Sequence, residues 1–349
     1  MKNNACSLDK SSGARFKVLI LGGVACLFAL AIVACLLGAA NISFIQILKV
    51  LFAQDNSADV NCIIWDIRIP RIFLGIIVGA SFAVSGAVMQ AVTQNPLASP
   101  SLAGLSAGST LGLLIAMVLI PGMTLEAGMI ASTAGSAVGV TLVFVVSMLA
   151  RNNNSPAGLA ISGLIVSMFL SSITSAILHA TNSGYELSFW TIGGLSASRW
   201  PHVNVVLPFF ISAFILVMSL SPSLTALALG SETATGLGVK VPRIRAAALI
   251  CVFVLVGSSV AVAGPIGFIG LMVPHIAKKI VGLNYTRVIA ASAVLGAILL
   301  LVSDTLARYL TQGSLSAGVF TTLVGSVFFI YLALNSGRNK KAKLKVENG

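Results

Sequence analysis

Ten long apolar blocks separated by short connections constrain this chain more than any other feature. A helix needs about 20 apolar residues to cross the roughly 30 Å hydrocarbon core of a bilayer, and most of these blocks have that length. Lipid offers no hydrogen-bond partners, so each block must satisfy its own backbone amides as a helix. Uniformly apolar blocks also exclude a membrane barrel, because its strands alternate in polarity over about 10 residues. The sequence predicts an all-α membrane protein with about ten transmembrane helices.

The expected spans share an apolar interior with small or polar residues at the ends, and the eighth is the shortest and weakest. They are residues 16–38, 70–90, 101–121, 127–149, 158–180, 203–224, 245–263, 267–282, 287–310 and 316–334. Only 9% of the residues are charged, against roughly 25% in a soluble domain. We therefore expect one transmembrane domain over 16–335, with cytoplasmic tails at 1–15 and 336–349, the second of them basic.

The lysines and arginines are distributed asymmetrically. If both termini are cytoplasmic, 16 of the 21 lie inside. The five on the outside are Lys49, Arg68, Arg71, Arg199 and Arg308. Cytoplasmic loops of membrane proteins carry such an excess of positive charge. The net charge of +12 thus indicates topology and not a nucleic-acid partner, and an even number of spans follows.

Motifs of catalytic chemistry are missing from the sequence. It contains no GxxxxGK[ST] phosphate loop, no HExxH and no Cys/His spacing typical of a metal site. GPIGFIG at 264–270 has the wrong spacing for a phosphate cradle and joins two spans, so we expect a tightly packed turn. We expect no enzyme activity, no cofactor and no metal site; His275 is interpreted as structural, because one histidine is not a ligand set.

The energy source is also constrained by the spans. An ion-coupled carrier places ionisable residues near the middle of the membrane. Here the main acidic residue within a span is Asp304, and it lies near an outside end. We therefore expect a partner protein to supply the energy, with an ion-coupled secondary transporter as the alternative.

Small residues recur at four-residue spacing inside several spans. This spacing is typical of helix faces that approach closely in lipid. The predicted packing faces are Gly75/Gly79, Gly104/Gly108/Gly112 and Gly135/Gly139.

Three of the outside arginines need an explanation. Arg68 and Arg71 lie in DIRIPRIFLG, where the second span begins, and a cation is mildly unfavourable at a helix N-terminus. They could extend to the interface or pair with Asp66, or they could form a clamp for carboxylates of an outside protein. Arg308 could pair with Asp304 at i,i+4.

The longest inside connection, residues 225–245, has glycine turns and a basic end. A short helix between Gly230 and Gly238 is expected, with Ser231 as its N-cap.

Several of these stretches together resemble the FecCD-type permeases of bacterial ABC importers for ferric siderophores, haem and cobalamin. The resemblance covers roughly residues 15 to 335. The stretches, in the order and spacing of that family, are RIPR (68–71), SGAVMQAVTQNPLASPSLAGLSAGSTLG (85–112), FWTIGGL (189–195) with Trp200, LGSETATGLGVKVPRIR (229–245), VAVAGPIGFIGLMVPHIAKKIVG (260–282) and SDTLAR (303–308). TQGSLSAGVF (311–320) departs from the proline-containing turn usual in the family.

The resemblance implies roles for individual residues. Arg68, Arg71 and Arg308 match the arginines that receive acidic residues of an extracytoplasmic substrate-binding protein. The positions that match the ATPase-coupling segment are Gly230, Glu232, Gly238 and Arg243. Asn95 and Leu97 match a cytoplasmic gate. A helix-capping role for Glu232 and a tight Asn-Pro turn at Asn95 remain open as alternatives.

The resemblance also implies an assembly. This chain would be one non-catalytic, multi-pass permease subunit in the bacterial cytoplasmic membrane, working with a second permease, identical or homologous, and a cytoplasmic ABC ATPase dimer. Its substrate would be a metal chelate delivered by the binding protein. An ABC permease for bare metal ions is a further alternative, but it predicts acidic or histidine clusters that the spans lack, and a non-transport scaffold is disfavoured by docking features on both sides.

Overall fold

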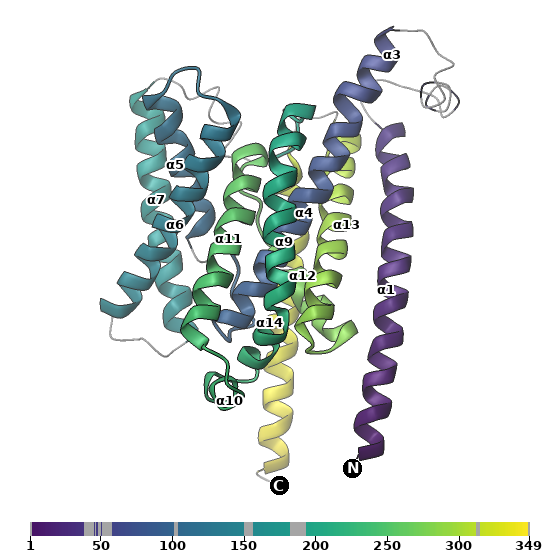
Figure 1. Ribbon diagram of the computed structural model, residues 1–349, viewed down its shortest axis with the longest axis vertical. Coiled ribbons are helices and arrows are strands. Elements are labelled where there is room, and N and C mark those ends of the chain that lie inside the picture. The colour runs from purple at the N-terminus through teal and green to yellow at the C-terminus, as the bar shows by residue number, and fades with distance from the viewer. Residues whose placement is uncertain are drawn as a thin grey trace.

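The structure is a computed structural model, and it describes residues 2–37, 45, 47, 50, 58–100, 104–149, 156–181, 193–311 and 315–347. Within these ranges the regular structure is entirely helical (Figure 1). The helices are α1 (Lys2–Leu36), α3 (Ala58–Cys62), the π-helix η1 (Ile63–Arg68), α4 (Ile69–Val92), α5 (Leu105–Leu119), α6 (Leu125–Leu149), α7 (Pro156–Ala180), α9 (Trp200–Ala228), α10 (Ser231–Gly236), α11 (Val241–Ala263), α12 (Ile269–Val281), α13 (Tyr285–Thr311) and α14 (Ala317–Glu347). Lys49 lies outside the described residues. So do residues 101–103 and 189–192, which belong to two of the family-like stretches.

A helix coincides with each of the ten predicted spans, which confirms the all-α membrane fold. Seven of the described helices are long and apolar enough to cross a membrane. Two apolar helices are shorter, α5 and the Ala317–Tyr331 part of α14. The weak eighth span is α12, which has 13 residues and contains Pro274.

The two chain ends lie at the same end of the helix bundle, and α10 lies there as well (Figure 1). The short helix α3 lies at the opposite end. This arrangement agrees with an even number of spans, and the excess of positive charge makes the end with the termini cytoplasmic. α1 already begins at Lys2, inside the segment predicted as a tail, and the division into tails and a central domain stays a prediction.

Helix α4 forms the centre of the bundle. In the apolar part of Asp59–Val92, the span that contains α4, 89% of the residues are buried, against 6% in the span Gly13–Leu36 of α1. α4 packs against α9, α11, α12 and α13, while α5, α6 and α7 pack together on one flank and α1 lies on the other (Figure 1). The core is therefore built around the helix that begins within the RIPR stretch.

The predicted glycine faces are confirmed, and two of them are partners. Gly104, Gly108 and Gly112 of the α5 segment meet Gly135 and Gly139 of α6, backbone against backbone. A Cβ atom built on Gly108 would overlap the Gly135 carbonyl oxygen. Close contact of this kind replaces the hydrophobic effect, which cannot drive helix association within lipid.

A second close contact places the start of α12 inside the bundle. Gly270, in the first turn of α12, lies against the backbone of Gly86 in α4. The turn before it contains Phe268 with a positive φ of 65°, and Gly194 N–H donates to the Ala263 carbonyl at 2.7 Å. The GPIGFIG segment is thus the tightly packed turn that the sequence predicts.

Replacing Gly108 by alanine tests the α5–α6 contact. The added methyl group overlaps backbone that cannot move aside, so we expect Gly108→Ala to lower the free energy of unfolding by about 1–3 kcal/mol. Gly22 is the matched control, because a Cβ there has no neighbour within 4 Å. Thermal unfolding in detergent should leave Gly22→Ala unchanged or slightly stabilised; equal effects of the two substitutions would contradict this packing.

Candidate functional site

A buried carboxylate holds two of the predicted docking arginines. Asp304 of α13 is 0% exposed. Arg71 binds it with two nitrogens, Nε at 2.9 Å from Oδ2 and Nη2 at 2.8 Å from Oδ1. Arg308 Nε lies 3.3 Å from Oδ2, which confirms the i,i+4 pair expected from the sequence. The bidentate geometry of Arg71 is the strong form of this interaction.

The third arginine contacts the end of α1. Arg68 is 4% exposed, and its Nη1 donates to the Cys35 carbonyl and, at 3.5 Å, to that of Leu36. Arg308 Nη2 donates to the Ala34 carbonyl at 3.3 Å. The last carbonyls of a helix have no partner within it, so these two arginines cap α1.

We call Arg68, Arg71, Arg308 and Asp304 the outer arginine cluster. Its three guanidinium groups and one carboxylate leave a net charge of +2, contributed by helices far apart in the sequence. The side chains of Arg71 and Arg308 are 15% and 11% exposed. The structure therefore brings together all three arginines that the resemblance singled out. Their role in docking stays a prediction.

A tryptophan connects the same outer end to the π-helix η1. Pro70 has no N–H, so the carbonyl of Trp65, five residues earlier, lacks the donor that a π-helix would supply. Trp200 Nε1 donates to this carbonyl at 2.8 Å, and its ring lies 5.9 Å from that of Phe73. Sequence reasoning placed Trp200 in a family-like stretch but missed this role, since the pairing spans 135 residues.

At the cytoplasmic end, the predicted coupling residues surround α10. Gly230 and Gly238 bracket it with positive φ angles of 129° and 81°. Glu232 lies exposed in its first turn, and Arg243 is exposed after it. The prediction of Ser231 as N-cap was wrong. Gly230 takes that position, since only glycine readily adopts its backbone conformation.

The hydroxyl of Ser231 instead joins three segments. It accepts hydrogen bonds from Gln94 Nε2 at 3.0 Å and from Arg245 Nη2 at 2.9 Å. Gln94 also donates to the Leu227 carbonyl at 2.9 Å. The turn after α4 is thereby tied to α9, α10 and α11. Sequence reasoning missed these contacts, whose only local signal is the Gln-Asn-Pro turn itself.

The predicted gate residues lie in that turn. Asn95 is 7% exposed, and its Oδ1 accepts the Leu97 N–H at 2.9 Å. Leu97 is 45% exposed. The tight Asn-Pro turn considered from the sequence is therefore present. A gating role for the two residues stays a prediction.

Within the described part of the chain, no group of three or more His, Cys, Asp or Glu side chains could hold a metal ion. The ring of His275 lies 6.0 Å from that of Phe328 in an edge contact.

Comparison with known proteins identifies relatives of this chain. A sequence model of the FecCD transport family matches residues 25–335. The Fe(3+)-citrate import system permease protein YfmD of Bacillus subtilis (strain 168) is 40% identical over 336 residues, covering 96% of this chain and 99% of the relative. The Fe(3+) dicitrate transport system permease protein FecC of Escherichia coli (strain K12) is 36% identical, covering 79% and 84%. A solved structure of a metal-chelate type ABC transporter in an inward-facing conformation matches with a TM-score of 0.77 at 26% identity, covering 90% of this chain and 98% of that one.

Removing the carboxylate of Asp304 tests the outer arginine cluster. Asp304→Asn leaves Arg71 and Arg308 without their buried counter-charge, and we expect a loss of about 3–5 kcal/mol in the free energy of unfolding. The exposed Asp66 provides the control. Asp66→Asn should change the unfolding midpoint in detergent little, and similar midpoints for both variants would argue against the cluster.

Proposed function

The chain belongs to the FecCD transport family, and from this premise we propose that it is the permease subunit of a binding-protein-dependent ABC importer that carries a ferric siderophore or a related metal chelate into the cell. It is a multi-pass protein of the cytoplasmic membrane. The observation that carries the proposal is the family match. It is supported by two groups of residues that resemble sites of this family, the outer arginine cluster at one end of the bundle and the residues around α10 at the other. We propose that the subunit itself catalyses no reaction.

The outer arginine cluster is proposed to receive the substrate-binding protein. Guanidinium groups pair with carboxylates in a fixed two-point geometry, and the Nη1 groups of Arg71 and Arg308 are not used by Asp304 or the Ala34 carbonyl. The net charge of +2 attracts an acidic partner surface. Because such surface attraction is screened over about 8 Å at physiological salt, docking should weaken as ionic strength rises.

The segment around α10 is proposed to contact a cytoplasmic ATPase dimer. Leu229 and Leu237, at either end of α10, are 60% and 67% exposed. Glu232 and Arg243 add opposite charges beside them. Exposed leucines rimmed by charged side chains are typical of a protein interface. At the cytoplasmic end these leucines lie outside the lipid, so a partner protein would remove their apolar surface from water.

The contacts of Ser231 suggest how ATPase movement reaches the membrane. A displacement of α10 changes the position of Ser231 and, through Gln94, of the turn that holds Asn95 and Leu97. We propose that this turn closes or opens the cytoplasmic end of the path as the bundle changes between two states.

The assembly is proposed to contain a second permease and to carry a chelate. Relatives are named as permeases for Fe(3+)-citrate and iron(3+)-hydroxamate. An ion-coupled transporter remains the second candidate only if uptake proceeds without an ATPase. A permease for bare metal ions would need ligand side chains along its path, and no such cluster occurs among the described residues.

Docking can be tested without disturbing the fold. Arg71→Gln together with Arg308→Gln and Asp304→Asn removes all three members of the ion pair at once, so none of them is left as an unpaired charge, and Arg68 keeps its contacts with the α1 carbonyls. We expect this triple variant to unfold like the wild type. Its affinity for the binding protein should fall by about tenfold or more, since a hydrogen bond to a charged group contributes about 1.5–3 kcal/mol. Flotation of the binding protein with proteoliposomes measures this affinity, and unchanged affinity would rule out docking on Arg71 and Arg308.

The proposed contact between the α10 segment and the ATPase can be tested with the two glycines Gly236 and Gly238. Gly238 has a positive φ, whereas Gly236 does not, and a Cβ at either has open space around it. Gly238→Ala therefore strains only the backbone, by about 1–2 kcal/mol. We expect it to weaken co-purification of the ATPase roughly five- to thirtyfold, and Gly236→Ala to leave it intact. Equal retention of the ATPase by both variants would show that this segment is not the contact.

A further inference from the structure

Lys278 carries a positive charge into the cytoplasmic end of the bundle. It lies in the last turn of α12, where its Nζ donates to Gln90 Oε1 of α4 at 2.8 Å and lies 5.2 Å from the centroid of the Tyr285 ring. Gln90 and Tyr285 are 3% and 2% exposed, so the ammonium group contacts neutral side chains that are themselves buried. Among the residues whose side chains the structure describes, no carboxylate pairs with Lys278. Withdrawing a charge from water is costly unless an opposite charge is near, so this position favours an anion.

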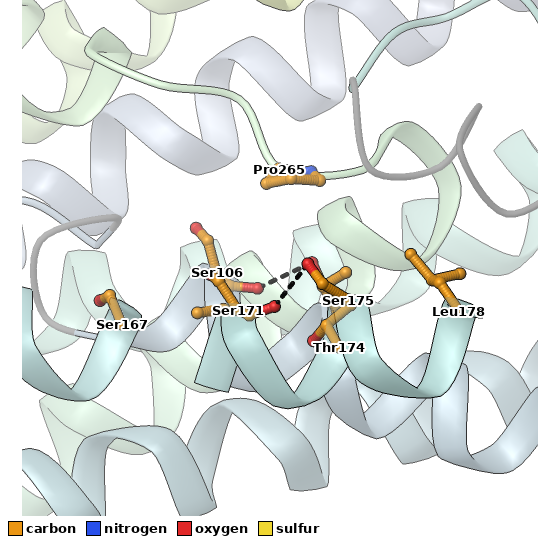
Figure 2. A pocket seen from close by; sticks show the side chains of 9 residues that line it. Ser106, Ser167, Ser171, Thr174, Ser175, Leu178 and Pro265 are labelled. Atoms are coloured by element: carbon orange, nitrogen blue, oxygen red, sulfur yellow. Dashed lines mark hydrogen bonds between the residues drawn. The ribbon is translucent and has the colours of Figure 1, made fainter. Parts of the chain in front are cut away.

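A cavity between α5 and α7 shows how uncharged polar groups in the bundle are satisfied (Figure 2). It measures about 340 Å³ and is lined mainly by serine and threonine. Hydroxyl groups there donate to carbonyls of their own helix, from Thr110 to Ser106 on α5 at 2.9 Å and from Ser175 to Ser171 on α7 at 3.0 Å. A hydroxyl group satisfied in this way needs no counter-charge, whereas an ammonium group does. The charge of Lys278 is therefore the stronger indication of a ligand.

Two neighbouring cations extend the positive charge from α12 to α13. Lys279 follows Lys278 directly and is exposed. Arg287 lies half-buried in the first turn of α13, just after the turn that begins at Gly282. The start of α13 also contributes the positive end of its helix dipole. Because α12 and α13 pack against each other, these charges lie together at one end of a helix pair.

Helix α1 brings two more cations to this end. A Cβ atom built on Gly13 would lie 3.9 Å from Nη2 of Arg287, so α1 passes directly beside α13 here. Arg15 and Lys17 follow Gly13 within one turn, and both are exposed. α1 packs against both α12 and α13. We call the five cations of the three helices the inner basic cluster, which consists of Arg15, Lys17, Lys278, Lys279 and Arg287.

The inner basic cluster adjoins apolar surface that faces lipid. In the apolar part of the span Gly13–Leu36 only 6% of the residues are buried, and Val18 and Leu21, just after Lys17, are 71% and 73% exposed. Leu283, in the turn between α12 and α13, is 63% exposed. Cations beside exposed apolar side chains match the two parts of a phospholipid, its charged headgroup and its acyl chains.

The proposed ATPase contact lies elsewhere. α10 packs against α9 and α11, whereas α1 lies on a flank of the bundle away from it (Figure 1). Of the acidic side chains that the structure describes, only Glu232 lies at the cytoplasmic end, and it belongs to α10. The position of the cluster thus favours a lipid over the ATPase as the source of the anion.

We propose that the inner basic cluster binds the headgroup of an anionic phospholipid from the inner leaflet. Lysine and arginine side chains both form charge-assisted hydrogen bonds with phosphate oxygens, and Nζ of Lys278 gives only one of its three donors to Gln90. The acyl chains would lie along the apolar side of α1. Such a lipid would hold α1, which few residues bury, against α12 and α13. This site goes beyond the proposed importer function.

The full chain, purified in a neutral detergent, provides the test. Native mass spectrometry measures its binding of phosphatidylglycerol and of phosphatidylcholine, and we expect the wild type to prefer phosphatidylglycerol. Lys278→Gln together with Lys279→Gln should lower the affinity for phosphatidylglycerol about twenty-fivefold, since each lysine near an anionic lipid surface contributes about a factor of five. Lys240→Gln with Arg243→Gln is the matched control, because it removes the same charge from two exposed side chains beside α10. It should stay within about twofold of the wild type.

A second double variant separates lipid binding from folding. Lys17→Gln with Lys279→Gln changes exposed side chains only and leaves the hydrogen bond from Lys278 to Gln90 in place. We expect the same loss of affinity for phosphatidylglycerol, with the unfolding midpoint of the wild type when no anionic lipid is added. Added phosphatidylglycerol should raise the midpoint of the wild type more than that of this variant.

Several outcomes would overturn the proposal. One is equal affinity of the wild type for the two lipids, and another is equal affinity of the cluster variants and the control variant for phosphatidylglycerol. Inorganic phosphate that raises the midpoint as much as phosphatidylglycerol would indicate a site for a soluble anion. Loss of ATPase co-purification from the cluster variants with unchanged lipid binding would assign the surface to the ATPase. The lipid measurement involves no transport, so its result is independent of the proposed function.

Discussion

Every backbone polar group that this chain carries into lipid must find a partner within the protein, and most of its structure follows from that constraint. Helices satisfy most of the backbone, and groups at the outer end that a helix leaves unpaired are satisfied at specific contacts. The end of α1 is capped by Arg68 and Arg308, and the Trp65 carbonyl, deprived of a donor by Pro70, receives the indole N–H of Trp200. These outer contacts join α1 to η1 and α13, and α9 to η1.

One helix connects the two ends at which partners are proposed to bind. α4 carries Arg71 in its first turn, and the Gln94 turn follows its last. With 24 residues it is about 36 Å long. Because its span is 89% buried, α4 can move only together with the helices around it. A change at the outer arginine cluster can therefore reach the cytoplasmic turn as a movement of the bundle.

The sequence predicted the local and compositional features well. Apolar block lengths located a helix for each of the ten spans, glycine spacing identified the packing faces, and the GPIGFIG turn and the Arg308–Asp304 pair followed from short-range chemistry. Ser231 was assigned wrongly as an N-cap because serine is a common capping residue, and nothing local revealed that Gly230 would take the position and leave the hydroxyl to Gln94 and Arg245.

The sequence alone thus determined that the chain is a helical membrane protein of this family, since span length, charge asymmetry and motif order are properties of short segments. Only the tertiary structure decided that Arg71 shares Asp304 with Arg308 across 233 residues, that the glycines of α5 face those of α6, and that serines of two helices line one cavity. These choices depend on how the helices are rotated about their axes and crossed in the bundle. In lipid, that rotation is selected by close packing and polar pairing between distant segments. The sequence of a single short segment does not specify these contacts.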